Sequence, residues 1–406
     1  MKNPAHLPEV LRTREPLKSL AEIEALAAEL SRHAIISFDT EFIRENTFYP
    51  SVELIQVGTR TDSWLIDAQA FRGKNISALR PLLDIFENPK ILKILHAAQG
   101  DQECLYTSYK IVAKPSFDTA VGAALCGYGD GIGLGNLMKA LLNVNLKKGH
   151  ARTNWAARPL PAQLIEYAHA DVEHLVEAAE FLLEKLDETG RRAWSLELSA
   201  KWEDPALYEP DAEGMTTKLA KSGRMDARTY GTLVELMRWR EDRVRSLNLP
   251  RRWVADDQVL LDLANVKPKD IEHLSAFRGL NKGEMKASGE KILEAIRRGA
   301  DAKDGRAPDS PRIDHPSSDE SQALDLMKTY LGILADRERI AMKHLLTTGQ
   351  LLPLLREKVS DPKEWVEKKL MSAEAARLVG GELHAMLEGK RALSIEGRKI
   401  KIVPIE

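Results

Sequence analysis

The stretch Ser37-Phe38-Asp39-Thr40-Glu41-Phe42 ends an apolar run that predicts a buried strand, yet it contains two carboxylates. Side chains alternate between the two faces of a strand, so Asp39 and Glu41 point the same way and lie close together. Two like charges at that distance repel and raise each other's pKa unless a cation lies between them. The pair therefore predicts a metal site. The plainer alternative is an ordinary strand end at which one of the acids caps a turn.

Two segments downstream supply further carboxylates for the same point. A short apolar run at 91–95 predicts a strand, and Asp101 falls in the first turn of the helix expected after it. An acid there also complements the helix dipole, which is the simpler explanation. In the amphipathic stretch after Pro161, Tyr167 and Asp171 are four residues apart and share a helix face. Asp171 stands where an apolar residue is expected, and a buried acid needs a partner.

Taken together, Asp39-Thr40-Glu41, Asp101, and Tyr167 followed by Asp171 resemble the three motifs of the tyrosine-containing DEDD 3′–5′ exonucleases. The surrounding sequence is similar to that of the ribonuclease D branch of the superfamily at residues 38–42, 47–50, 54–56, 153–155 and 158–160. In that branch an Asp is usual where Asn154 stands, a departure outside the proposed metal ligands. The resemblance covers essentially the whole chain.

This resemblance implies a catalytic set and a cofactor. It implies that Asp39 bridges two divalent ions, that Glu41 and Asp171 complete one site, and that Asp101 holds the other. Two hard ions about 4 Å apart serve phosphodiester hydrolysis, and carboxylates without Cys or His favour Mg²⁺ or Mn²⁺ over Zn²⁺. Tyr167 would orient the attacking water, because a hydroxyl with a pKa of about 10 is a poor free base.

The composition agrees with a globular enzyme. The chain has 406 residues, enough for roughly two to four domains, with 43% hydrophobic and 30% charged residues. Its net charge of −2 gives no global signature of nucleic-acid binding, so any such contact must rest on local basic patches. The two cysteines, Cys104 and Cys126, argue against a disulfide framework. Neither a secretory leader nor an apolar span of transmembrane length is present, so we expect a cytoplasmic protein without membrane contact.

Residues 1–202 alternate predicted strands and helices, which favours a mixed sheet covered by helices. The resemblance implies the same α/β architecture, a ribonuclease H-like nuclease domain. A capping box at Ser19 and Glu22 opens the first helix. The predicted strands are 34–42, 51–58, 63–67 and 91–95, and the predicted helices are 19–31, 76–86, 117–125, 134–142 and 161–186.

Two loops in this half invite functional interpretation. The glycine-rich stretch 127–135 fits neither a P-loop nor the dinucleotide fingerprint, so a flexible loop is the better interpretation. The loop containing Lys147, Lys148 and Arg152 is basic and leads into Trp155. Cations beside an aromatic ring suit the phosphates and bases of a single strand, and the alternative is a solvated loop.

The second half is predicted to be all α. A Pro/Asp/Glu-rich linker at 203–216 precedes a helical domain at 217–300 that resembles the HRDC nucleic-acid-binding module. Between 224 and 298 it has 16 Lys and Arg against 12 Asp and Glu, and Arg251-Arg252-Trp253 adds an aromatic residue. We favour phosphate contact for this module, and the alternative is a solvated helix face whose arginines pair with acids. After a linker at 301–321, residues 322–406 resemble a second, degenerate HRDC-like domain or form a helical cap without nucleic-acid contact.

The sequence thus predicts a 3′–5′ exoribonuclease that releases nucleoside 5′-monophosphates. The resemblance implies processing of the 3′ ends of tRNA precursors and other structured RNAs, with a single-stranded 3′ end as partner and the protein acting as a monomer. Two alternatives stay open: a 3′–5′ DNA exonuclease, because proofreading domains share the same five catalytic residues, and a non-catalytic RNA-binding scaffold. The HRDC-like domains and the sequence at residues 47–56 favour RNA over DNA as the substrate. The presence of all five catalytic residues in order favours an enzyme over a scaffold.

Overall fold

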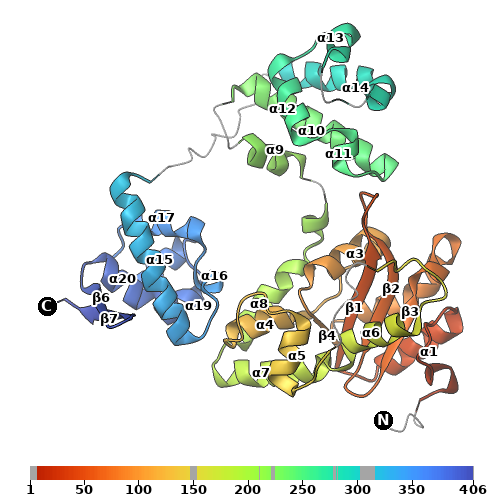
Figure 1. The fold of residues 1–406 in the computed structure, drawn as a ribbon, viewed down its shortest axis with the longest axis horizontal. Coiled ribbons are helices and arrows are strands. Elements are labelled where there is room, and N and C mark those ends of the chain that lie inside the picture. Colours follow the sequence, from red (N-terminus) through yellow and green to blue (C-terminus); the bar gives the residue numbers. More distant parts are fainter. Residues whose placement is uncertain are drawn as a thin grey trace.

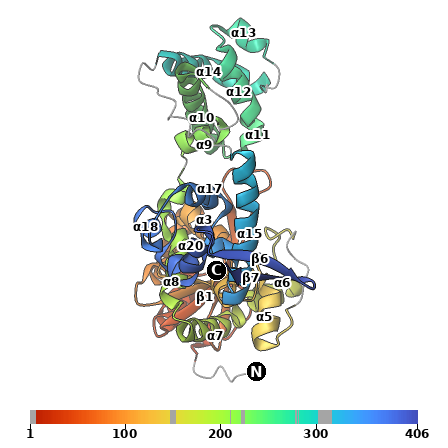
Figure 2. The ribbon, with the colours of Figure 1, turned by 90° about the vertical axis from the view of Figure 1, so that its left-hand side faces the viewer.

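The computed structural model describes residues 7–146, 153–209, 211–220, 225–277, 280, 282–301 and 316–405. Three regions follow one another along the chain: an α/β region up to residue 209, a middle helical region at 211–301, and a C-terminal region at 316–405 (Figure 1). The middle helical region lies at one end of the molecule in both views, beyond the other two regions (Figure 2). In the described part of the chain, no helix has the length and apolar character needed to cross a membrane.

A five-stranded mixed sheet of order β3-β2-β1-β4-β5 forms the centre of the α/β region. β1 pairs with β2 and β2 with β3 in antiparallel fashion, whereas β1, β4 and β5 run parallel. The predicted mixed sheet is confirmed, but the sequence missed β5 and assigned its last two residues to the helix expected at 117–125. Three residues are too few for strand alternation to show. The strands are β1 Ile35–Ile43, β2 Ser51–Gly58, β3 Ser63–Asp67, β4 Leu92–Leu95 and β5 Ser116–Asp118.

The predicted helices of the α/β region begin and end close to the observed ones, with two differences, and the helix Arg192–Ala200 was not predicted. The stretch expected to be one helix at 161–186 is two helices that meet at His174. The helix expected from residue 76 begins at Arg80, because Pro81 lacks an N–H and suits a first turn. The helices are α1 Leu20–Leu30, α2 Arg80–Glu87, α3 Gln99–Tyr109, α4 Thr119–Leu125, α5 Leu134–Leu142, α6 Ala162–Glu173, α7 Leu175–Glu188 and α8 Arg192–Ala200.

Strand alternation divides the side chains of β1 between two packed faces. Phe38 stacks on Phe86 of α2, with ring centroids 4.7 Å apart, in the core that also holds α1. On the other face, Ser37 donates a hydrogen bond to the carbonyl of Val172 in α6 (3.0 Å). A Cβ at Gly58 would lie only 2.7 Å from the same carbonyl oxygen. The absence of a side chain at Gly58 therefore lets α6 lie directly on β1 and β2.

The middle helical region packs around its own apolar core, to which Leu236, Leu260 and Ile292 contribute. The preceding segment, 203–216, expected to be a linker, has regular structure: a short 3₁₀ helix, Pro205–Tyr208, lies within it and α9 (Ala212–Ala220) begins in it, while another 3₁₀ helix, Lys201–Glu203, ends at its first residue. Asp204 caps the helix Pro205–Tyr208 by accepting from the Ala206 N–H (2.9 Å), which accounts for an acidic residue in that segment. The helices are α9 Ala212–Ala220, α10 Ala227–Leu247, α11 Arg251–Val254, α12 Asp257–Val266, α13 Ile271–Ser275 and α14 Lys282–Asp301.

The C-terminal region is helical up to Leu387 and ends in a β-hairpin that the sequence analysis did not anticipate. The helical stretch from 322 onwards is divided into several helices, the longest of which ends at Glu338. Its elements are α15 Ser318–Glu338, α16 Met342–Leu345, α17 Thr348–Arg356, α18 Pro362–Glu367, α19 Ala373–Ala375, a π-helical turn at Ala376–Gly380, α20 Gly381–Leu387, β6 Arg391–Glu396 and β7 Lys399–Pro404.

The C-terminal region is anchored to the α/β region through Arg191. This buried guanidinium donates to the carbonyls of Leu125 (3.1 Å) and Glu338 (3.0 Å) and forms an ion pair with the Glu338 carboxylate. The Ala341 N–H donates to the Ala124 carbonyl (3.1 Å), and apolar side chains of both regions belong to one buried cluster. The end of α15 is therefore held against the end of α4.

Candidate active site

The carboxyl-terminal half of β1 has a sheet partner on one side only. It pairs with β2 along its length, with Asp39 opposite Gln56 and Glu41 opposite Leu54. It pairs with β4 only from Ile35 to Ser37. The strands diverge from there, so the edge of β1 is free of β4 where the two acids lie. Crevices at the carboxyl ends of diverging strands are common ligand sites in α/β sheets.

Asp101 occupies the position beside β1 that β4 leaves open. Its Oδ1 accepts hydrogen bonds from the backbone N–H of Thr40 (3.0 Å) and from the Thr40 hydroxyl (2.5 Å). The start of α3 is fixed in turn by Asp118, whose carboxylate accepts from the N–H groups of Ala97 (2.9 Å) and Ala98 (3.0 Å). Asp101 is thus held in place from both its own helix and the strand.

α6 brings Asp171 to the acids of β1. Asp39, Glu41 and Asp171 each offer one carboxylate oxygen such that the three atoms lie within 4.8 Å of one another. Tyr167, one turn earlier on the same helix, packs beside Trp155 with ring centroids 6.1 Å apart. The structure therefore brings together the residues that the sequence placed on three separate elements.

Burial raises the pKa of every carboxyl in this cluster. The pKa of Asp39 rises to about 6 through burial. Burial and then the charge of Asp39 raise the pKa of Asp171 to about 8. The pKa of Glu41 rises to about 9, through burial and then the charges of Asp39, Asp171 and Asp101. The pKa of Asp101 is also raised, by burial and by Asp39, although its bonds from Thr40 oppose the shift.

No Lys or Arg among the described residues forms an ion pair with these four carboxylates. Buried like charges without a counter-ion are unfavourable, and a divalent cation is the usual compensation. Donors that are all carboxylates suit hard ions such as Mg²⁺ and Mn²⁺. The cluster therefore indicates a divalent metal site.

A pocket of about 770 Å³ adjoins the cluster on the side of α6. Tyr167, Asp171 and His174 line it from the helix, and Val144 and Leu146 line it from the segment after α5. The site thus has an open space next to the acids that is large enough for a small ligand.

The structure separates the residues that the sequence proposed for nucleic-acid contact. Lys147, Lys148 and Arg152 lie outside the described residues. Trp155 is 3% exposed and belongs to the core between α6 and the sheet, so its ring cannot stack on a base in this arrangement. Its apolar neighbours Leu54, Leu65 and Leu164 explain the burial.

The residues of the middle helical region that were proposed to contact nucleic acid differ in how accessible they are. Arg251 donates two hydrogen bonds to the carboxylate of Glu241, one from Nε and one from Nη2, each 2.7 Å long. Arg252 and Trp253 are exposed, the latter at 52%, and their proposed contact stays a prediction. Four of the five arginines of α10 pair with acids, as the plainer alternative holds: Arg238 with Glu213 and Glu235, Arg240 with Asp257, Arg243 with Glu284, and Arg245 with Asp242.

Sequence reasoning missed two supports of the site. Thr40 stands between the paired acids, and alternation gave no reason to expect that it would bind Asp101. Arg158 forms a two-pronged ion pair with Asp67 at the end of β3 (2.9 and 2.7 Å) and donates to the Trp155 carbonyl (2.7 Å). That clamp positions Trp155 and, through it, Tyr167. A lone arginine in an irregular segment does not reveal its partner, so sequence alone could not identify the clamp.

Two family models match the chain. One, described as a 3′–5′ exonuclease, matches residues 15–187, and the HRDC domain model matches residues 231–296. The first range contains the entire acidic cluster and Tyr167. The fold and site therefore define a 3′–5′ exonuclease with an HRDC domain behind it.

Relatives that align over nearly the whole chain narrow this class. Ribonuclease D of Granulibacter bethesdensis is 31% identical over 399 residues, covering 97% of this chain and 98% of that protein. Ribonuclease D of Jannaschia sp. is 32% identical over 392 residues, covering 95% and 98%. The crystal structure of Escherichia coli RNase D has the same fold, with a TM-score of 0.72 at 23% identity over 92% of this chain and 98% of that one. The chain belongs to the ribonuclease D family and is a 3′–5′ exoribonuclease.

The raised pKa values predict that the metal-free protein loses stability as the pH rises. Asp39, Asp171 and Glu41 have folded-state pKa values of about 6, 8 and 9, above their ordinary values of 3.8 and 4.5. Their protonated forms therefore favour folding below pH 4, and this contribution is lost as the pH rises towards 9. In EDTA the melting temperature should fall across this window, and Mg²⁺ should raise it by at least about 3 °C more at pH 8.5 than at pH 5.

Thermal unfolding of wild type and Asp171→Asn provides the comparison. The variant removes one charge from the cluster, so its melting temperature should depend less on pH and on Mg²⁺. Identical pH profiles for the two proteins in EDTA would contradict the electrostatic description of the cluster.

Proposed function

We propose that this exoribonuclease uses two divalent ions to release nucleoside 5′-monophosphates from single-stranded 3′ ends of structured RNAs, tRNA precursors among them. The observation that carries the proposal is the convergence of Asp39, Glu41 and Asp171 beside Asp101, with no ion pair from a described Lys or Arg. Hydrolysis of a phosphodiester places further negative charge at such a site, so the site needs compensation that these side chains do not supply.

The four carboxylates would hold two Mg²⁺ or Mn²⁺ ions, which when bound offset the charge of the reacting phosphate and ease ionisation of the attacking water. The remaining chemistry falls to the side chains. Burial, Asp171 and Glu41 raise the pKa of the Tyr167 hydroxyl, so it stays protonated and orients a water rather than removing its proton. Packing against Trp155 limits the rotation of the Tyr167 ring and supports that role.

The pocket beside α6 supports a place for the terminal nucleotide. Tyr167 and Asp171 form part of its wall, so a nucleotide bound there would present its 5′ phosphate to the acids. The pocket has an apolar side at Val144 and Leu146, which suits contact with a base or a ribose without selecting one sequence.

RNA as substrate is supported by the family and by its member in Escherichia coli, which is described as an exoribonuclease involved in structured RNA processing. The exposed Arg252 and Trp253 of the HRDC domain are accessible to a single strand. Four further expectations from the sequence stay predictions: the domain limits, the monomeric state, a cytoplasmic location, and nucleic-acid contacts by Lys147, Lys148 and Arg152. The C-terminal region is assigned to a second HRDC-like domain on the same basis.

A time course on a 5′-labelled tRNA precursor with a 3′ trailer tests the proposed reaction. With Mg²⁺ or Mn²⁺ the trailer should shorten one nucleotide at a time, the product should be nucleoside 5′-monophosphate, and EDTA should stop the reaction. Asp171→Ala should lose at least about 10³-fold in rate, because it removes one of the carboxylates that would hold the metal ions, which offset the charge of the reacting phosphate. Asp325→Ala, which changes an exposed acid of α15, should react as wild type. Faster degradation of a matched DNA strand would favour the DNA exonuclease alternative instead.

Tyr167→Phe tests the role of the hydroxyl separately from metal binding. The ring and its packing remain, so the protein should fold and bind Mn²⁺ as before, while kcat should fall about 10²-fold or more with little change in KM. Tyr330→Phe removes a hydroxyl that binds Glu382 in the C-terminal region (2.9 Å) and should leave kcat unchanged. An unchanged kcat in Tyr167→Phe would show that the attacking water does not depend on this hydroxyl.

A further inference from the structure

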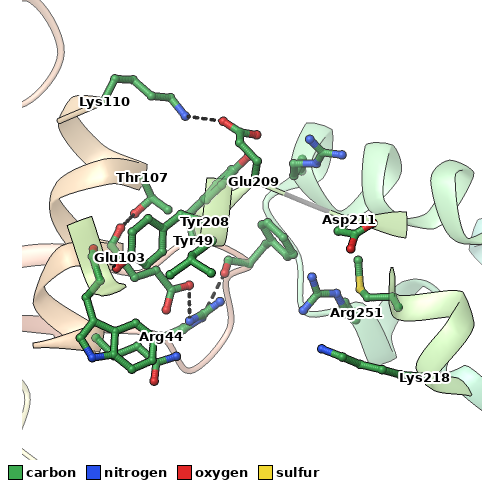
Figure 3. Close-up of a pocket in the computed structure, with 16 residues that line it drawn as sticks. Arg44, Tyr49, Glu103, Thr107, Lys110, Tyr208, Glu209, Asp211, Lys218 and Arg251 are labelled. Atoms are coloured by element: carbon green, nitrogen blue, oxygen red, sulfur yellow. Dashed lines mark hydrogen bonds and ion pairs between the residues drawn. The ribbon is translucent and has the colours of Figure 1, made fainter. Parts of the chain in front are cut away.

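A second pocket lies between α3 of the nuclease domain and the HRDC domain, and nothing in the catalytic scheme uses it. Its volume is about 360 Å³, within the range of roughly 300–1,000 Å³ typical of ligand pockets. Figure 3 shows Glu103, Thr107 and Lys110 of α3 on one side, and Lys218 and Arg251 on the other. The pocket is therefore built jointly by the two domains.

The two domains meet at this pocket through direct hydrogen bonds. The side-chain oxygen of Asn248, at the end of α10, accepts from the backbone N–H groups of Phe48 (3.1 Å) and Tyr49 (3.0 Å). The guanidinium of Arg251 lies over the Phe48 ring, 4.9 Å from its centroid. These contacts hold the loop between β1 and β2 against the HRDC domain and set the spacing of the pocket walls.

The lining itself has five basic and three acidic side chains, and two of the basic ones, Arg245 and Arg251, pair with Asp242 and Glu241 outside it. Arg44 pairs with Glu103 (2.8 Å), and Lys110 lies 4.0 Å from Glu209, but all four side chains are partly exposed. Such pairs contribute little, so an incoming phosphate can replace their acidic partners. The basic residues of the lining are Arg44, Lys110, Lys218, Arg245 and Arg251, and the acidic ones are Glu103, Glu209 and Asp211.

Aromatic rings stand among these cations. Tyr49, Trp202 and Tyr208 line the pocket and are partly exposed. Tyr208 is held by a hydrogen bond from its hydroxyl to the Trp202 carbonyl (2.7 Å), so its ring has a fixed orientation. Cations that contact phosphates and rings that stack on bases are the combination that single-stranded nucleic acids require.

The pocket lies beside the part of α3 that carries Asp101, on the other face of that helix, and burial, Glu103 and Asp101 raise the pKa of Tyr208 in its lining. Gln99 and Glu103, both in its lining, lie two residues before and after Asp101 on α3. The pocket beside α6 approaches the acids from the other helix, and the two pockets share no lining residue among those described. A strand with its terminal nucleotide against α6 would therefore meet the second pocket after crossing the acids.

We propose that the pocket between α3 and the HRDC domain binds the RNA strand upstream of the scissile phosphate. This inference rests on the proposed function, because it takes the 3′ end to lie at the acidic cluster. It assigns to Lys110 and Lys218 phosphate contacts from the two domains, and to Tyr208 a stacking contact. Substrates too short to reach the pocket gain none of these contacts.

The test compares 5′-labelled oligoribonucleotides of two to ten nucleotides as substrates for wild type and Lys110→Gln/Lys218→Gln. For wild type, kcat/KM should rise with length and then level off. The double variant should hydrolyse the dinucleotide as wild type does, and should lose about tenfold in kcat/KM on the longest RNA through a higher KM. Its affinity for that RNA in EDTA should also depend less steeply on salt, because fewer cations contact phosphates.

Two further variants complete the design. Tyr208→Leu should reduce the length effect without changing the salt dependence, and Lys139→Gln/Lys328→Gln, which removes two charges outside the pocket, should match wild type. A double variant that equals wild type at every length, and in RNA affinity in EDTA, would overturn the pocket assignment. If wild type hydrolysed no RNA of any length, the proposed function would fail, while the affinity measurement in EDTA would still decide whether the pocket binds RNA.

Discussion

Repulsion among the clustered carboxylates is the constraint on which the rest of this structure depends. Oxygens of Asp39, Glu41 and Asp171 lie within 4.8 Å of one another. Two full charges about 4 Å apart at an effective dielectric constant of about 20 repel by roughly 4 kcal/mol. Protons relieve this at low pH, and near neutral pH a divalent cation is the compensation that the donor atoms fit. The fold therefore maintains an arrangement that is unfavourable by itself and becomes favourable with its ligand.

Several unrelated contacts hold that arrangement. The divergence of β4 from β1 after Ser37 opens the strand edge, and Asp101 fills it through Thr40. The missing side chain at Gly58 allows α6 to lie close enough to deliver Asp171. The clamp from Arg158 to Asp67 sets Trp155 beside Tyr167. Each support comes from a different element, so the geometry of the acids depends on the whole nuclease domain.

The sequence predicted most of the fold and which residues form the cluster, because both leave local patterns. Alternation placed Asp39 and Glu41 on one face, and helical spacing placed Tyr167 and Asp171 on another. Contacts between distant segments leave no such pattern, so the burial of Trp155 and the pairing of Arg251 with Glu241 were not foreseen. The three-residue strand β5 has too few residues to show alternation, whereas the six-residue strands of the terminal hairpin do alternate polar and apolar residues and were overlooked.

The most direct test of the central claim is the number of Mn²⁺ ions bound per chain, measured by equilibrium dialysis in the presence of a nucleoside 5′-monophosphate. Wild type should bind two ions. Asp39→Asn, which keeps the shape of the side chain and removes the charge that both ions would share, should lose at least one. If Asp39→Asn bound as many ions as wild type and with the same affinity, the clustered acids would not be the metal site.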